Sequence, residues 1–480
     1  MLFPFQWKIN DLKKMDFSNQ ISLKLISPRP GSKWKRASIQ EGEERKLLFN
    51  EQNYFYEFTH DALYDFGDDN DESLIHHYER TETDEKEVSF VFGHRGTEYK
   101  LRLKYLNLNI YATGVGVLSF YLSNTTYSKP EDILIINQFA RRVYPLFMED
   151  LDYRRLLPDF VRIDGLDGEY AEDFEGYKLC ADNRPASYVT KLIFDIAPNI
   201  DIIPVVDDRM FVLSWYKNND ITRIFSASED IAPLKDSDFW YKYVFVQDSH
   251  VNCYNKAMRH KLIEESTYLR WQGVGSIYGF SRNSFVYLTD ESTPQYLLSN
   301  FETEYVRMAE MVLVQRASVL RFSEEISLLS SDKMENAELS KHVNSLRKAF
   351  IRFVNQMHFR EVTAQEQGID FYKKLYEFAD LEMYVKKLDG EIEELDNYVS
   401  MVEERNINHI VGNLSMIATF FVPATVLSGI FGMNNTWANG LSEGELTSSL
   451  WQNPVFELGI IGGVSVLFVL GFYLVKKRKK

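Results

Sequence analysis

The residues with the clearest chemical potential are Gly432, Met433 and Asn434, which stand where an apolar stretch meets a polar loop. The Asn434 carboxamide offers an oxygen that can accept hydrogen bonds from the water shell of a hard cation such as Mg²⁺, which sheds its water reluctantly. The alternative is that Asn434 only ends a helix, a position where asparagine is common. The choice depends on the elements that position the tripeptide.

Two mostly apolar segments, 410–431 and 458–475, flank the loop that contains the tripeptide. Each is about as long as a helix that crosses a hydrocarbon core of about 30 Å. The basic tail, 476–480, is typical of a cytoplasmic terminus. We therefore expect two membrane spans, with both termini in the cytosol and the loop 432–457 outside.

The chain before the spans has long helical patterns with little Gly or Pro. We expect a helical hairpin over 294–362 and a stalk helix over 363–409, which could continue unbroken to residue 431. Its apolar positions recur in steps of three and four, a pattern that faces other helices, either copies of itself or the two preceding helices. They are Phe371, Leu375, Phe378, Leu381, Val385, Leu388, Ile392, Leu395, Val399 and Val402.

Residues 1–293 read as a cytosolic sensor domain of mixed α/β character, either α+β or α/β. Alternating apolar residues predict strands at 21–26, 88–92 and 99–104, and another strand-like run covers 106–122. The segment 131–144 looks helical. An acidic run between Asp61 and Glu87 is either a solvated loop or a regulatory cation site.

Composition excludes several classes of protein. The formal net charge of −16 disfavours direct nucleic-acid binding, and the basic cluster Lys33, Lys35 and Arg36 around Trp34 is too short to reverse it. No catalytic triad, zinc signature or phosphate-binding loop occurs, so we expect neither an enzyme nor an organic cofactor.

The segment from Ile417 to Asn434 resembles the first transmembrane helix of the CorA family of Mg²⁺ transporters, which ends in Gly-Met-Asn. The resemblance covers the C-terminal third of the chain and does not extend convincingly into residues 1–290. It implies a funnel-shaped homopentamer in a bacterial inner membrane. Gly432, Met433 and Asn434 would form the selectivity filter, with a ring of Asn434 side chains holding Mg²⁺ through its bound water.

The same resemblance assigns a pore lining on the first span. Its residues are Asn408, Leu414, Val422, Thr425 and Gly429. Leu414 and Val422 would form a hydrophobic constriction, unless they only contact lipid or a helix. Val422 replaces a methionine that is common in the family. Glu443 and Glu445 are the first carboxylates of the outer loop and the candidates for attracting cations.

Two functions remain open from the sequence. One is a divalent-cation channel, with Mg²⁺ as the transported ion and as a regulatory ion in the cytosolic domain. The alternative is a membrane effector of type III CRISPR antiviral defence, whose CorA-like pore is controlled by a nucleotide second messenger. A coiled-coil scaffold without conduction is a third interpretation.

Overall fold

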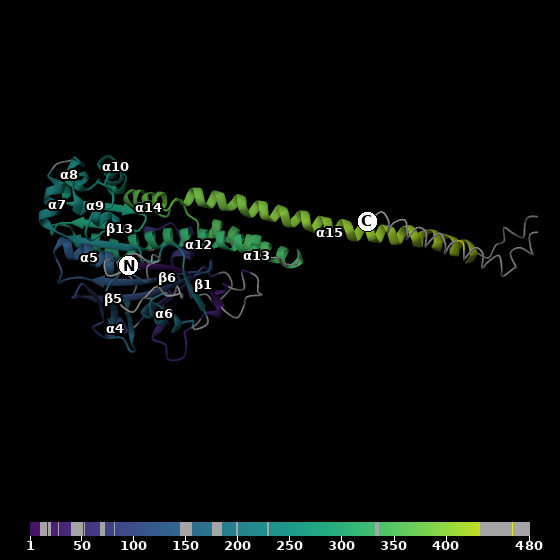
Figure 1. Ribbon diagram of the computed structural model, residues 1–480, viewed down its shortest axis with the longest axis horizontal. Helices are drawn as coiled ribbons and strands as arrows, with labels where there is room; N and C mark the ends of the chain where they lie inside the picture. Colours follow the sequence, from purple (N-terminus) through teal and green to yellow (C-terminus); the bar gives the residue numbers. More distant parts are fainter. Residues whose placement is uncertain are drawn as a thin grey trace, which may run out of the picture. The chain divides into compact units, whose positions relative to one another are not determined.

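The computed structural model describes residues 1–9, 17, 21–26, 28–39, 51, 53–67, 73–80, 82–144, 156–174, 185–197, 200–227, 230–331, 336–432 and 463. The chain divides into two compact units, Met1–Asp396 and Asn397–Lys480. The first unit contains two sheets and the helices that cover them (Figure 1).

Nine of the described strands form one antiparallel sheet, in the order β8-β7-β4-β5-β6-β1-β9, with β3 on β5 and β2 on β3. The strands are β1 (Leu2–Ile9), β2 (Trp34–Arg36), β3 (Ile75–Arg80), β4 (Ser89–His94), β5 (Thr97–Tyr111), β6 (Val115–Ser123), β7 (Phe160–Asp164), β8 (Tyr170–Asp173) and β9 (Ile200–Pro204). The long β5 pairs with β4 through its first half and with β3 through its second half.

Tight turns set the register of this sheet. Arg95 and Gly96, both with positive φ, join β4 to β5 in the two-residue turn that suits hairpin twist. The predicted run 106–122 is in fact two strands, because the chain reverses at Gly114, where φ is +75°. The strand expected at 21–26 is wrong: η2 (Leu23–Leu25) is a turn of 3₁₀ helix.

A smaller sheet has the order β10-β13-β12-β11, from β10 (Val212–Lys217), β11 (Thr267–Tyr268), β12 (Ser276–Ser281) and β13 (Ser284–Thr289). Four helices gather beside it in Figure 1: α7 (Asn219–Ser226), α8 (Ala232–Lys235), α9 (Asp238–Phe245) and α10 (Lys256–Ser266). Their core centres on buried Trp240 and Tyr243. Both sheets together confirm the mixed α/β character expected of the N-terminal region.

Other short helices of the N-terminal region are η4 (Glu57–Thr59), α3 (His60–Leu63), α4 (Glu82–Glu85), α5 (Pro130–Phe139), α6 (Ser187–Phe194) and η7 (Gln272–Val274). The predicted helix at 131–144 therefore ends at Phe139. On α6, Tyr188 packs edge-on against Phe90 and Phe120 of the large sheet.

A series of helices, four of them long, follows the two sheets. They are α11 (Gln295–Asn300), the π-helical turn η8 (Phe301–Tyr305), α12 (Val306–Ser331), α13 (Asn336–Gln356), α14 (Glu366–Phe378) and α15 (Leu381–Gly432). The helix α12 contacts β1 and β6 of the large sheet, beside which it lies in Figure 1. The Arg321 guanidinium donates to the carbonyls of Trp7 at 2.6 Å and Gly114 at 2.8 Å.

The stalk helix is not continuous. It breaks between α14 and α15 at Asp380, whose φ of +59° is left-handed and cannot continue an α-helix. The break lies beside the β12–β13 turn, where Arg282 donates to the Phe378 carbonyl at 3.4 Å and pairs with Asp380 at 3.6 Å. Earlier on α14, Phe371 contacts Tyr278, Phe280 and Phe285 of the small sheet. An unbroken helix from 363 to 431 is therefore wrong.

The predicted apolar seam is used mainly inside the chain. Phe371, Leu375, Leu381, Leu388 and Ile392 are at most 4% exposed. An ion pair between Arg347 of α13 and Asp396 of α15 joins the seam's polar flank to the preceding hairpin. Up to Asp396 the seam is therefore covered within the chain, by the small sheet at Phe371 and by the preceding helix α12 along α14.

We expect an added methyl group to have opposite effects on stability at two glycines in these helices, Gly390 and Gly368. Gly390 is exposed with open space around it, so Gly390→Ala should stabilise the protein by about 1 kcal/mol through helix propensity. At Gly368, a Cβ would lie 2.6 Å from the Tyr54 hydroxyl and 2.7 Å from Thr363, so Gly368→Ala should cost roughly 1–3 kcal/mol. Urea unfolding of both variants measures the two signs, and a gain for Gly368→Ala would contradict this packing.

Candidate functional site

The five predicted lining residues all belong to one helix, α15. Asn408, Leu414 and Val422 are exposed in the single chain, the latter two by 61% and 58%. The Thr425 hydroxyl donates back to the Phe421 carbonyl at 2.7 Å, so it is satisfied within its own helix. Gly429 lies in the last turns before Gly432, where the helix ends.

The helical backbone brings these five positions onto one face. At about 100° per residue, they fall within an arc of about 120°. The same arc contains Val411 and Ser415, whereas Phe421 lies about 20° and Ile417 about 60° beyond its edge at Leu414. The five predicted positions thus form a continuous stripe along one face of α15, which a strand or a broken helix would not have produced.

Large apolar side chains around this stripe are uncovered. Seven of them expose more than half of their surface: Ile407, Ile410, Val411, Leu414, Ile417, Phe421 and Val422. A contiguous apolar surface of this kind marks a site that another molecule or a membrane covers.

Part of the predicted site lies outside the described residues. This applies to Met433, Asn434, Glu443, Glu445 and, apart from Gly463, the second span at 458–475. Within the described part of the chain, no helix combines the length and the hydropathy needed to cross a membrane. Both spans and the filter remain predictions.

Comparison with known proteins identifies the region that carries the stripe. The model of the family described as CorA-like Mg²⁺ transporter protein matches residues 295–477. A cobalt/magnesium transport protein CorA from Thermotoga maritima is 26% identical over 176 residues, which cover 33% of this chain and 46% of the relative. The match thus spans about half the length of that curated protein.

Residues 295–477 are thus similar to the CorA-like Mg²⁺ transporter family. The family is one of transporters and not of enzymes, in agreement with the sequence-based expectation. The CorA-like region begins at the first residue of α11 and includes the whole stripe on α15.

A resident metal centre is a separate question from a transported ion. Among the described residues, no group of three or more His, Cys, Asp or Glu side chains could hold a metal ion. The acidic run includes strand β3, and its Asp65 is buried and paired with Arg36 at 2.6 Å, so it is not simply a solvated loop. Its residues Asp68, Asp69, Asp71 and Glu72 lie outside the described residues.

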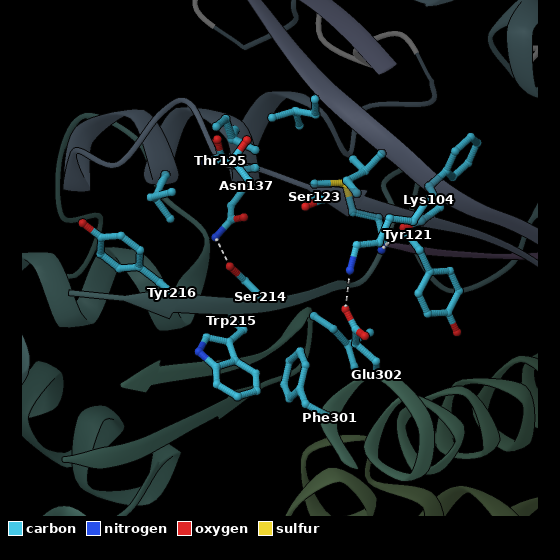
Figure 2. A pocket seen from close by; sticks show the side chains of 18 of the residues that line it. Lys104, Tyr121, Ser123, Thr125, Asn137, Ser214, Trp215, Tyr216, Phe301 and Glu302 are labelled. Carbon is cyan, nitrogen blue, oxygen red and sulfur yellow. Dashed lines mark hydrogen bonds and ion pairs between the residues drawn. The ribbon is translucent and has the colours of Figure 1, made fainter. Parts of the chain in front are cut away.

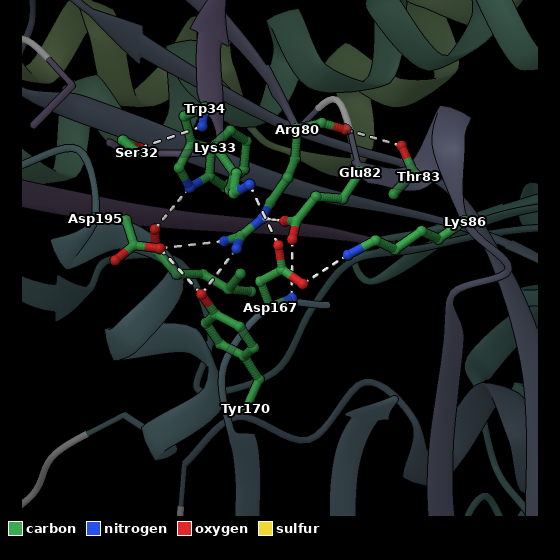
Figure 3. A network of polar contacts seen from close by, with 11 residues as sticks. Ser32, Lys33, Trp34, Arg80, Glu82, Thr83, Lys86, Asp167, Tyr170 and Asp195 are labelled. Atoms are coloured by element: carbon green, nitrogen blue, oxygen red, sulfur yellow. Dashed lines mark hydrogen bonds and ion pairs between the residues drawn. The ribbon is translucent and has the colours of Figure 1, made fainter. Parts of the chain in front are cut away.

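The basic cluster near Trp34 is part of a structural network (Figure 3). Arg80 is 2% exposed and donates to Glu82 at 2.5 Å and to the Tyr170 hydroxyl at 2.8 Å. Burial opposes its charge, but these hydrogen bonds outweigh burial and raise the Arg80 pKa. Lys33 pairs with Asp167 at 3.2 Å. Carboxylates thus neutralise cations here, and the network fixes β2 and β3 rather than presenting a basic surface.

Sequence reasoning missed a charged cluster in the connection between β9 and β10. Asp207 and Asp208 both contact Arg209, at 2.9 and 3.3 Å. Arg141 and Arg142 lie nearby and are only 1% and 4% exposed. Burial and the neighbouring Asp207 raise the pKa of Asp208 to about 6, whereas hydrogen bonds from Asp208 and Arg209 outweigh burial and lower that of Asp207. Adjacent aspartates in the sequence gave no signal of this burial.

The two aspartates predict opposite responses to pH. Because the folded-state pKa of Asp208 exceeds the ordinary value of about 3.9, its protonation adds stability at acidic pH, which is lost as the pH rises through about 6. Asp208→Asn should therefore stabilise the protein at pH 8, on the order of 1 kcal/mol, and lose this advantage near pH 4. Thermal unfolding at both pH values measures the difference.

The matched control is Asp207→Asn, which removes an ionised carboxylate from Arg209. It should lower the unfolding midpoint at pH 8. If both variants shift the midpoint in the same direction at pH 8, the assignment of the proton to Asp208 is wrong.

Proposed function

We propose that the chain is a subunit of a CorA-like channel that conducts divalent cations, with Mg²⁺ as the principal ion. The observation that carries this proposal is the stripe on α15, which lies inside the family-matched region and leads to Gly432. One face of a helix can line a pore only when several copies surround an axis. The proposal therefore includes a homo-oligomer, with five copies suggested by the family resemblance.

The exposed apolar surface of α15 supports this assembly. In a single chain in water, about seven half-exposed large side chains would be costly, since burying each is worth about 1.5–3 kcal/mol. Neighbouring copies would cover the side chains next to the stripe, and lipid would cover the outer ones. The proposed location is the bacterial inner membrane, with both termini in the cytosol.

The filter would consist of Gly432, Met433 and Asn434 at the outer end of this helix. A ring of Asn434 amide oxygens can hold hydrated Mg²⁺ through its water, which avoids the high cost of stripping the ion. Glu443 and Glu445 would raise the local cation concentration at the entrance.

Leu414 and Val422 would form the gate of the pore. Apolar rings exclude water when they narrow, and an ion cannot pass a dry constriction. The stripe places Asn408 below this gate, where an amide can again contact a hydrated ion.

The signal that opens this gate has two candidates. One is Mg²⁺ itself as a regulatory ion, as in the channel hypothesis. The other is a nucleotide second messenger, as in the CRISPR-associated alternative. The nucleotide alternative is favoured by one observation: the two sheets, which precede residue 295, lie outside the family-matched region. The chain would then join a CorA-like region to a sensor of a different kind.

Ion flux into liposomes tests the pore. The full chain is reconstituted in vesicles loaded with a Mg²⁺-sensitive dye, and Mg²⁺ is added outside. We expect uptake, and at least a tenfold lower rate for Asn434→Ala. The neighbouring Asn435→Ala is the control and should retain the flux, because it leaves the proposed filter intact.

The outcomes separate the hypotheses. Flux with Mg²⁺ alone supports the channel, and flux that starts only after a nucleotide is added supports the nucleotide-controlled effector. Intact oligomers without flux under either condition would refute a conducting pore and leave the scaffold interpretation. Equal flux in both asparagine variants would refute the filter.

A further inference from the structure

A cavity of about 500 Å³ lies where the two sheets of the first unit separate (Figure 2). Strand β10 meets β1 only once, at Leu2 and Phe211, which exchange backbone hydrogen bonds of 2.9 and 2.7 Å. Beyond this bridge β10 diverges from the large sheet. The wedge between them is the cavity, closed by α5 on one side and by η8 on the other.

Strand β10 is an edge strand, and its free edge lines the cavity. The parallel register with β13 directs the backbone groups of Val212, Ser214 and Tyr216 toward β13. The backbone groups of Leu213, Trp215 and Lys217 therefore point the other way, along the side on which Phe211 bonds to Leu2. All three residues line the cavity, and within the described residues no strand pairs with this side.

An unpaired edge of this kind has alternating donors and acceptors at the spacing of a peptide backbone. A rigid ring or a sugar could satisfy one or two of these groups. An extended peptide satisfies them in series, which is the basis of recognition by strand addition.

The side-chain lining adds two further features. Trp215 uses its indole N–H outside the cavity, donating to the Thr289 hydroxyl at 2.8 Å, and its ring meets Phe301 edge-on at 5.9 Å. With Leu101, Ile133 and Ile136 also in the wall, the cavity offers an apolar site for one side chain.

Asn137 is a polar group built into this wall. It is 5% exposed, and its amide nitrogen donates to the Ser214 hydroxyl at 3.2 Å. Figure 2 shows the amide oxygen directed away from Ser214, and no hydrogen bond to that oxygen occurs among the described residues. It can accept a hydrogen bond from a ligand N–H.

The charges that line the cavity favour a ligand with one negative group. Lys104 of β5 pairs with Glu302 of η8 at 3.1 Å, and both side chains are more than one third exposed. The Lys217 ammonium lies 5.6 Å from the Trp215 ring. The two lysines and Glu302 leave an excess of one positive charge, because burial lowers the pKa of the Met1 amino group, which also lines the cavity, to about 5. Glu302 lies on a π-helical turn, an irregularity that is common at functional sites.

We propose that this cavity binds a short extended peptide that ends in a free carboxylate. Its backbone pairs with the edge of β10, its terminal apolar side chain lies against Trp215 and Phe301, an N–H meets Asn137, and its carboxylate binds Lys104. Only this class of ligand uses the edge, the apolar wall and the cation together. The site belongs to the first unit alone and does not depend on the proposed pore.

Calorimetric titration of the full chain in detergent tests the proposal. The probes are four acetylated tetrapeptides, Val-Thr-Val followed by Phe, Leu, Val or Ala, each with a free carboxylate. We expect at least one to bind below 1 mM. Its C-terminal amide, and its analogue with a methylated central amide nitrogen, should each bind at least tenfold more weakly, which corresponds to about 1.4 kcal/mol.

Variants separate the cavity from other surfaces. Lys104→Met should weaken the free-carboxylate peptide about tenfold and leave the amide unchanged, and Glu302→Gln should strengthen the peptide by releasing Lys104. Leu298 of α11 also lines the cavity, so Leu298→Trp should fill it and abolish binding. Lys100→Met, on the same strand and exposed, is the matched control and should have no effect. Circular dichroism verifies that each variant is folded.

Several results would refute the proposed peptide site. Absence of binding by all four peptides at 1 mM refutes the site, as does binding that is the same in Leu298→Trp. Binding that tolerates methylation refutes strand pairing. If adenosine monophosphate binds with the same dependence on Lys104 and the peptides do not, the assigned ligand class is wrong.

Discussion

The contact on which the architecture depends is the buried guanidinium of Arg321. It is 2% exposed, donates to the backbone of both β1 and the β5–β6 turn, and lies 5.3 Å from the Phe17 ring. Burial lowers its pKa to about 10, so it still carries its charge at neutral pH. Burying a charge is costly unless it is hydrogen-bonded or paired; the two carbonyls bond Nη1, and the Glu325 carboxylate lies 4.0 Å from Nη2. The turn at Gly114 is shaped for this contact, because a Cβ there would lie 2.6 Å from the guanidinium carbon.

Because Arg321 fixes α12 to the large sheet, the other helices acquire a rigid base. Gln315 of α12 donates to the Met357 carbonyl and to the Tyr372 hydroxyl, at 3.0 and 2.8 Å, which links α12 to the end of α13 and to α14. Phe371 of α14 then packs on the small sheet. The CorA-like helices are therefore continuous in packing with both sheets.

The same packing separates two kinds of polar site. In the Arg80 network, Arg80 is paired with Glu82, and in the cluster between β9 and β10, Asp207 and Asp208 are paired with Arg209 inside the unit. The cavity beside β10 differs, because it has an unpaired strand edge and a cation that is only partly neutralised. Closed networks stabilise a fold, and open ones bind a ligand. The contrast gives the first unit a structural part and a recognition part.

The sequence by itself determined the CorA-like region, because each signal for this region is local. Apolar periodicity, charge-free stretches and the tripeptide Gly432-Met433-Asn434 each lie within a short segment of the sequence. It also predicted the mixed strands and helices of the N-terminal unit and the stripe residues Asn408, Leu414, Val422, Thr425 and Gly429. Only the tertiary structure decided the break at Asp380, the strand pairing of β5 with both β3 and β4, and the wedge between β1 and β10. These features arise from contacts between residues far apart in the chain, such as Arg321 with Gly114 and Leu2 with Phe211, and no local pattern encodes them.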